Sequence, residues 1–175
     1  MERAFLGDSY DAVKRMWQEL LDDCAPLYAE PQFIPEELRH DFKKLTKIPM
    51  LEDQRPSNYS ILNDPCTGIR LPDMPNQAEG QKHVSIKTII RQLKMKNGAK
   101  CVVTFDQSIY RGIGMKPGEQ RQAKMQKLAE NECHSFYYVS HAQFLFAFPD
   151  NEALKNGEAI LKAAGIPQNR IEKIS

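Results

Sequence analysis

The sequence has no apolar run that approaches the roughly 18 uninterrupted residues needed to span a membrane. Its opening residues also lack the apolar stretch of a signal peptide. Charge of one sign is not in excess, because 24 Lys and Arg residues balance 23 Asp and Glu residues to a net charge of +1. These absences predict a cytoplasmic protein without a membrane partner, in which nucleic-acid binding would need a local basic patch.

Several short motifs that identify a reaction are also missing. The four cysteines are widely spaced and form no C-x-x-C pair, so a zinc site is not favoured and reduced thiols in an intracellular protein are expected. The segment Gly112-Ile113-Gly114 lacks the third glycine and the Lys-Ser/Thr of a phosphate-binding loop. No G-x-S-x-G turn is present to hold a nucleophilic serine.

What is present is the pattern of one α/β domain, residues 1–175. The composition, 41% hydrophobic and 27% charged, is typical of a folded globular protein. Amphipathic helices are expected to begin near Ser9, Pro35, Val84, Pro117 and Asp150. Strands are expected at residues 3–6, 69–71, 101–105, 136–139 and 170–174, and residues 142–148 are either a strand or a buried helical turn. This alternation predicts a mainly parallel sheet flanked by helices on both faces.

A long segment, residues 47–81, shows no periodicity. Five prolines divide it into turns and extended pieces: Pro49, Pro56, Pro65, Pro72 and Pro75. The sequence therefore predicts a long irregular loop inserted in the domain. Such loops are often functional in compact domains.

Polar side chains follow three of the expected strands. Asp8 comes after residues 3–6, Asp106 after residues 101–105, and Ser140 and His141 after residues 136–139. Because open α/β sheets bind ligands beyond the carboxyl ends of their strands, we expect these side chains to face one crevice. The alternatives are local: Asp8 is a good helix cap, and Ser140 and the Asp64-Pro65 pair are good turn formers.

Carboxylates that share a cleft repel each other unless a cation neutralises them. Mg²⁺ or Mn²⁺ suits such oxygen ligands and activates water for phosphoryl transfer. The sequence therefore predicts a metal site made by Asp8, Asp106 and Asp64. In this hypothesis His141 is a further ligand or acid–base group, and Ser140 is the other catalytic candidate.

A basic patch follows Asp106 directly. Residues 111–127 contain five cations and one acid, Glu119, so their local charge is five minus one, or +4. The cations are Arg111, Lys116, Arg121, Lys124 and Lys127. The first four are the candidates for contacts with the phosphates of a nucleic acid, and a solvated helix face is the alternative.

The stretch from Val84 to Lys127, a helix, an apolar strand ending in Phe105-Asp106 and a basic helix, resembles the core of PIN-like 5′-nucleases of the flap endonuclease type. The resemblance implies that Asp106 and Asp8 bind metal and that Arg111, Lys116 and Arg121 contact phosphates. Where that family has an acidic, metal-binding helix, residues 136–141 supply hydroxyls and an imidazole. The strand-end segments also resemble segments of uncharacterised bacterial proteins, which implies no activity.

The leading hypothesis from the sequence is a metal-dependent phosphodiester hydrolase that acts on nucleic acid. The first alternative is a non-catalytic α/β module that binds a nucleotide or a small anion in the same crevice. The second is a partner-binding protein that uses residues 47–81. Strand order, the choice between DNA and RNA, and the oligomeric state stay open at this point.

Overall fold

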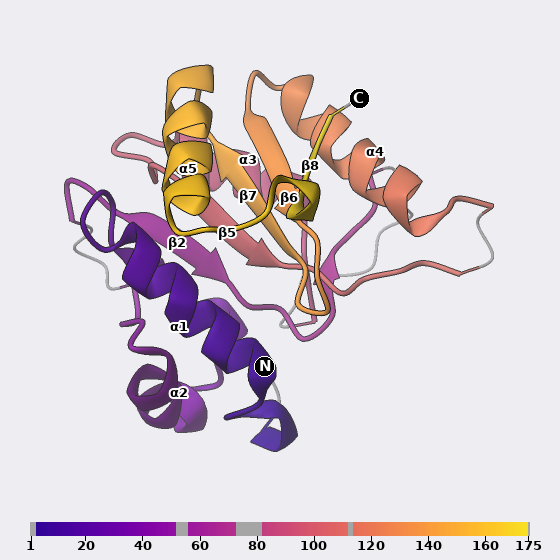
Figure 1. Cartoon of the computed structure of the whole chain (residues 1–175). Helices are drawn as coiled ribbons and strands as arrows, with labels where there is room; N and C mark the ends of the chain where they lie inside the picture. Colours follow the sequence, from indigo (N-terminus) through magenta and orange to yellow (C-terminus); the bar gives the residue numbers. More distant parts are fainter. Residues whose placement is uncertain (1–2, 52–55, 73–81, 112–113, 175) are drawn as a thin grey trace.

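The computed structural model describes residues 3–51, 56–72, 82–111 and 114–174. It confirms the expected α/β class: a six-stranded sheet lies between helices (Figure 1). The helices are α1 (Ser9–Leu21), α2 (Arg39–Thr46), α3 (Ile86–Lys94), α4 (Pro117–Ala129) and α5 (Asn151–Ala163). The strands of the sheet, in spatial order, are β1 (Leu27–Ala29), β2 (Ser60–Asn63), β5 (Val102–Phe105), β7 (Phe144–Phe148), β6 (His134–Tyr138) and β8 (Ile171–Lys173). A separate two-stranded ribbon pairs β3 (Gly68–Ile69) with β4 (His83–Val84).

The direction of the strands brings four carboxyl ends to one edge of the sheet. Strands β1, β2 and β5 are parallel neighbours. Strand β7 is antiparallel to both β5 and β6, so β6 runs in the same direction as β5. The residues that follow β2, β5 and β6 therefore lie at the same edge, as expected for the last two from the sequence.

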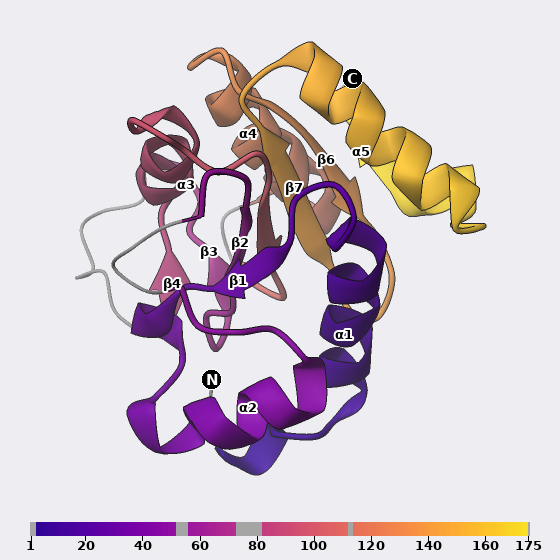
Figure 2. The ribbon, with the colours of Figure 1, turned by 90° about the vertical axis from the view of Figure 1, so that its left-hand side faces the viewer.

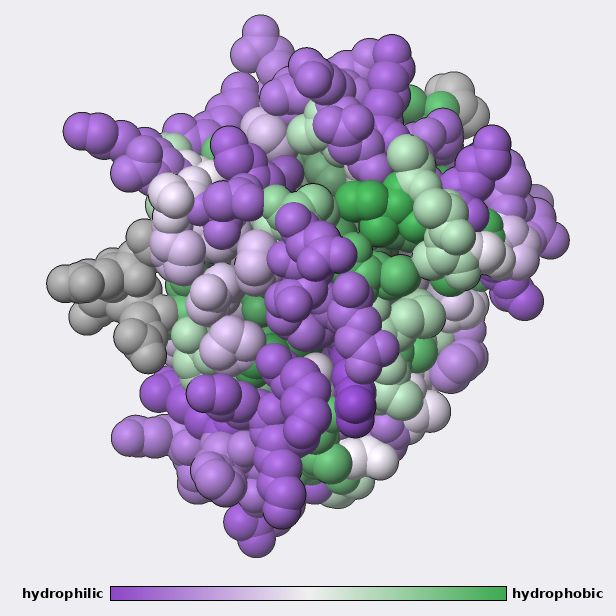
Figure 3. All heavy atoms as spheres, turned by 60° about the vertical axis from the view of Figure 1, so that its left-hand side comes forward, coloured by the Kyte–Doolittle hydropathy of each residue, from purple (hydrophilic) through white to green (hydrophobic). Residues whose placement is uncertain are grey.

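Helices cover both faces of the sheet (Figure 2), and an apolar core lies on each face. On one face, Trp17 of α1 and Phe42 of α2 belong to a core that also contains residues of the sheet and of α5. On the other face, Ile89 of α3 and Leu128 of α4 pack against the sheet. On the face shown in Figure 3, apolar side chains are visible between hydrophilic ones. The prediction of helices on both faces is confirmed.

Residues 3–6 do not form the expected first strand. Arg3–Phe5 is a single 3₁₀ turn, η1, and none of its residues is buried. A positive φ of 86° at Gly7 then turns the chain into α1. A strand is stabilised by pairing and by burial of one face, and this exposed segment has neither.

The segment 47–81 is less irregular than expected. It contains β2, a central strand whose four residues are all buried, and β3. The sequence of β2, Ser60-Ile61-Leu62-Asn63, has only two apolar residues and lies in a proline-rich segment. Its position between two other strands, and not its local pattern, therefore makes it a strand. Residues 52–55 and 73–81 of the predicted loop lie outside the described residues.

Of the helices that the structure describes, none is long and apolar enough to cross a membrane.

Candidate functional site

The pleat of the sheet separates the strand-end carboxylates. Asn63 of β2 is paired with Thr104 of β5, and their side chains form a hydrogen bond on the α3 side of the sheet. Side chains alternate between faces, so Asp64 points to the α1 side and Asp106 to the α4 side. The expected metal site of Asp8, Asp64 and Asp106 is therefore not assembled. The part of the chain that the structure describes contains no group of three or more His, Cys, Asp or Glu residues placed to hold a metal ion.

On the α1 side, Asp64 belongs to a buried ion-pair group that we call the Lys14 cluster (Asp11, Lys14 and Asp64). Lys14 Nζ lies 2.9 Å from Asp11 Oδ1 and 2.9 Å from Asp64 Oδ2. The second oxygen of Asp11 accepts a hydrogen bond of 2.7 Å from the Gly7 amide. Burial lowers the pKa of Lys14, but the charges of Asp64 and Asp11 raise it by more, so the net shift is upward. Lys14 is therefore a fixed cation between two carboxylates.

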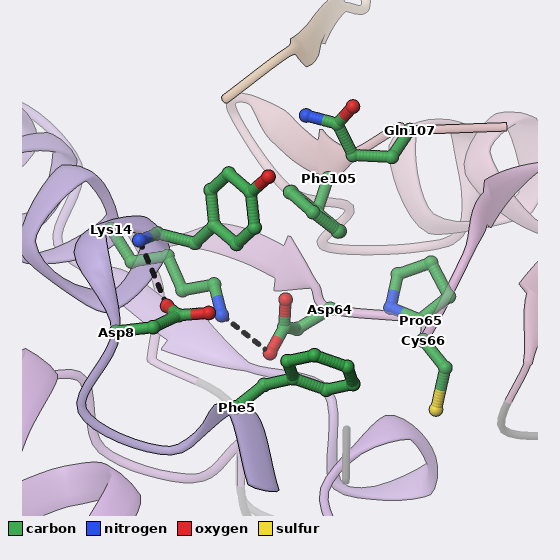
Figure 4. Close-up of a pocket in the computed structure, with 9 residues that line it drawn as sticks. Phe5, Asp8, Lys14, Asp64, Pro65, Cys66, Phe105 and Gln107 are labelled. Carbon is green, nitrogen blue, oxygen red and sulfur yellow. Dashed lines mark hydrogen bonds and ion pairs between the residues drawn. The ribbon is translucent and has the colours of Figure 1, made fainter. Parts of the chain in front are cut away.

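A pocket of about 210 Å³ opens beside the Lys14 cluster, and we call it the strand-end pocket (Figure 4). Segments from η1, α1 and the ends of β2 and β5 form it. Its lining residues are Phe5, Asp8, Tyr10, Lys14, Asp64, Pro65, Cys66, Phe105 and Gln107. This volume lies below the roughly 300–1,000 Å³ of sites for drug-sized molecules, so the pocket suits a small ligand.

Aromatic rings form much of the pocket wall. The centroid of the Tyr10 ring lies 5.3 Å from that of Phe105. The exposed His141 stacks on Tyr10, with centroids 5.8 Å apart and planes 25° apart. His141 does not line the pocket, but it contacts two residues that do: its ring stacks on Tyr10, and its backbone carbonyl accepts a hydrogen bond from Gln107 Nε2. Ser140 is held in a local turn, because its Oγ donates to the Ala142 carbonyl at 2.9 Å and accepts from the Ala142 amide at 3.0 Å.

The Asp8 side chain has two structural roles in this site. It is the N-cap of α1, and its Oδ1 accepts from the amides of Tyr10 at 2.8 Å and Asp11 at 3.3 Å. The capping alternative for Asp8 is thus confirmed. Its side chain also lines the strand-end pocket.

On the α4 side, Asp106 is the centre of the Lys124 cluster (Asp106, Ser108, Lys124 and Tyr137). Asp106 Oδ1 accepts from the Ile69 amide at 2.9 Å and from the Ser108 amide and hydroxyl at 3.1 and 2.5 Å. Its Oδ2 accepts from Lys124 Nζ and from the Tyr137 hydroxyl, both at 2.7 Å. These five donor groups surround a carboxylate that has about four lone-pair sites, and the single proton of the Ser108 hydroxyl is shared with the Ile69 carbonyl at 2.6 Å. No position is therefore left for a metal ion.

Burial controls ionisation in the Lys124 cluster. Burial lowers the pKa of Lys124 by more than Asp106 raises it, so the net shift is downward. Burial, followed by the charge of Asp106, holds the pKa of Tyr137 well above its usual value. The β3 strand approaches so closely that a Cβ atom on Gly68, where φ is +133°, would overlap Asp106. The Lys124 cluster is therefore a closed hydrogen-bond network, in which Asp106 is bonded to residues of β3, α4 and β6.

The predicted phosphate-binding patch is divided by the fold. Lys124 is 1% exposed and paired with Asp106, so its assignment to a surface contact is wrong. The partner of Arg121 is Glu172, at 2.5 Å, and Lys127 pairs with Glu130 at 2.9 Å. Arg111 and Lys116 are exposed. Carboxylates thus neutralise three of the five cations, and the +4 local charge does not form one continuous surface.

The residues that sequence reasoning missed carried a weak signal. Lys14 has the spacing of Trp17 and Leu21, three and seven residues away, which places its amine on the buried stripe of α1. Lys124 likewise lies on one helix line between the buried Gln120 and Leu128. A lysine at a core position of a helix indicates a buried acidic partner.

Comparisons with family models, with curated proteins and with solved structures found no match. The resemblance to PIN-like nucleases therefore stays a prediction, and the site is interpreted from its own geometry.

Proposed function

We propose that this protein binds a small ligand in the strand-end pocket and that it is a binding protein of the α/β class. The observation that carries the proposal is the hydrogen bonding of the Asp64 carboxylate; the residue as a whole is 3% exposed. Its Oδ2 accepts from Lys14, whereas no residue in the described parts of the chain donates to Oδ1. Figure 4 shows this oxygen turned away from Lys14, toward the space between the lining residues. A carboxylate oxygen that faces the pocket and accepts no hydrogen bond from the described residues is a ready acceptor for a bound molecule.

The position of the pocket supports the same proposal. It lies beyond the carboxyl ends of two parallel strands, β2 and β5, where open α/β sheets bind their ligands. Its wall combines aromatic rings with a few buried charges, which is the usual composition of a small-molecule site. The lining residues Phe5 and Cys66 are reachable from solvent, because neither is fully buried.

Binding without turnover is favoured over metal-dependent hydrolysis by the pairing of the carboxylates. Each strand-end aspartate already has a lysine as its counter-charge, so neither needs a divalent cation for neutralisation. Among the described lining residues, Cys66 is the one strong nucleophile and no histidine accompanies it. Metal-dependent cleavage of nucleic acid stays a prediction of the sequence, and the experiment below includes an arm that tests it.

The test is a thermal-shift screen of a library of small metabolites, run once with EDTA and once with Mg²⁺ or Mn²⁺. The pocket is blocked in Cys66→Phe, and Cys24→Phe is the matched control, because Cys24 is exposed and does not line the pocket. We expect ligands that raise the Tm of the wild type and of Cys24→Phe, with EDTA present, but not of Cys66→Phe. Circular dichroism checks that both variants are folded.

Two results would contradict the proposal. One is a library in which no compound raises the Tm of the wild type. The other is a set of ligands that stabilise Cys66→Phe as well as they stabilise Cys24→Phe. A shift that appears only with Mg²⁺ or Mn²⁺, together with cleavage of labelled DNA or RNA, would favour the hydrolase instead.

A further inference from the structure

We infer that the ligand of the strand-end pocket is a flat ring that carries a positively charged, hydrogen-bond-donating nitrogen. This inference rests on the proposed function and names the chemical class that the pocket would take. Three properties of the pocket carry it: its charge, its rings and its size.

The charge around the pocket is negative. Asp8 and Asp64 line the pocket, Asp11 lies behind Lys14, and Lys14 is the one cation of this group, so the formal charge is one minus three, or −2. The first amides of α1, which would otherwise attract an anion, are already bonded to Asp8. A phosphate or carboxylate ligand would therefore be repelled, and the nucleotide or anion expected from the sequence is disfavoured.

One acceptor is placed to receive a donor from a cation. Lys14 occupies Oδ2 of Asp64, and Oδ1 faces the pocket (Figure 4). A hydrogen bond between this carboxylate and a charged N–H group is shorter and stronger than one between neutral partners. The rest of the Asp64 side chain is buried, so the orientation of this oxygen is fixed at the pocket wall.

The rings of the pocket suit a flat cation. Phe5, Tyr10 and Phe105 line it. The protein already uses one of these rings in this way, since Lys14 Nζ lies 5.6 Å from the centroid of Phe105. Phe5 is 55% exposed, so its ring is held by little of the core and can pack against a ligand. A volume of about 210 Å³ admits a single ring with one polar substituent.

Three probes with the same ring test the charge directly: benzamidine, a cation; benzamide, its neutral analogue; and benzoate, an anion. Binding is measured by ¹⁵N chemical-shift titration at pH 7. We expect benzamidine to bind at least about tenfold more tightly than the other two, the size of one hydrogen bond to a charged group. The largest shifts should map to residues 5–10 and 64–66.

Two Asp→Asn variants test the acceptor. Asp64→Asn should weaken benzamidine binding at least about tenfold. Asp150→Asn, the same change at an exposed helix cap that does not line the pocket, should leave it within about twofold. Phe5→Ala removes an exposed ring without disturbing the core and should weaken binding about 2- to 5-fold. This third variant keeps the test valid if Asp64→Asn does not fold.

The outcomes separate this inference from the proposed function. If benzoate or benzamide binds in the pocket as well as benzamidine does, or if Asp64→Asn and Phe5→Ala both bind benzamidine unchanged, the inference is wrong and the ligand-binding function stands. If none of the three probes binds but a metabolite of the library does, blocked by Cys66→Phe, the inference is wrong and the function again stands. If nothing binds in the pocket, both are wrong.

Discussion

The Lys14 cluster and the Lys124 cluster are built from the same parts on opposite faces of the sheet. In each, a helix supplies a buried lysine to an aspartate that follows a parallel strand. They differ in the number of hydrogen-bond donors that surround the aspartate. Asp106 has five donors, whereas Asp64 has Lys14 as its one described donor and turns its second oxygen to a pocket. This difference is the reason that we assign a stabilising role to the closed cluster and propose a binding role for the open one.

The two lysines differ as well. Lys14 has two carboxylates and Lys124 has one, and that one shares its charge with four other donors. The carboxylates therefore outweigh burial at Lys14, and burial outweighs the carboxylate at Lys124. The positive charge of Arg121 adds to the effect of burial at Lys124, and the second carboxylate at Lys14 reverses it.

The largest expected effect comes from removing the closed carboxylate. Asp106→Ala leaves a buried lysine, a tyrosine hydroxyl and two amides without their acceptor, and should lower the free energy of unfolding by about 3–5 kcal/mol. Asp64→Ala should cost about 1–3 kcal/mol, because Lys14 keeps Asp11. Urea unfolding followed by the fluorescence of Trp17, the single tryptophan, measures both. An equal or larger loss in Asp64→Ala would contradict the distinction between closed and open clusters.

A smaller effect is expected where β3 closes the Lys124 cluster. Gly68→Ala introduces a Cβ atom that overlaps Asp106 at a φ that L-residues rarely adopt, and should lower stability by about 2–4 kcal/mol. Gly165→Ala is the matched control. Its φ is also positive, +81°, but nothing lies near its Cβ position, so it should cost only about 1–2 kcal/mol. Equal values for the two variants in the same urea experiment would show that the close approach of β3 has no energetic weight.

The smallest effect sharpens the comparison of the lysines. A ¹³Cε NMR titration, assigned with Lys14→Arg and Lys124→Arg, should find Lys124 losing its proton below the usual 10.5 and Lys14 above it. With its raised folded-state pKa, Lys14 contributes stability that is present below about pH 10.5 and lost as the pH rises through that pKa. Lys124 has a lowered pKa, so it opposes folding below that pKa, and this penalty disappears as the pH rises to 10.5. The opposite order of the two titrations would refute the assignment.

Much of the fold could be predicted from the sequence. The apolar run before Asp106 and the amphipathic pattern of α1 report burial directly, because their periods are those of a strand and a helix. The edge of the sheet that carries the polar residues also follows from strand direction. Strand β2 could not be predicted, because its burial comes from neighbours that are distant in the sequence.

The face on which each carboxylate lies could not be predicted either. It depends on the register between β2 and β5, and a shift of one residue moves a side chain to the opposite face. The partner of Asp64 is 50 residues away along the chain, and the partner of Asp106 is 18 away. Composition and spacing show that the charges exist, whereas pairing in three dimensions decides which of them are available to a ligand.

The five donors around Asp106 have a consequence for the residue before it. Phe105 is the chain neighbour of Asp106 and lines the strand-end pocket on the opposite face. Anchoring Asp106 from both oxygens fixes the end of β5, and with it the backbone that carries the Phe105 ring. The part of the pocket wall that Phe105 forms is therefore preorganised before any ligand arrives. Little conformational entropy would be lost there on binding. The closed cluster on one face thus supports the rigidity of the open pocket on the other.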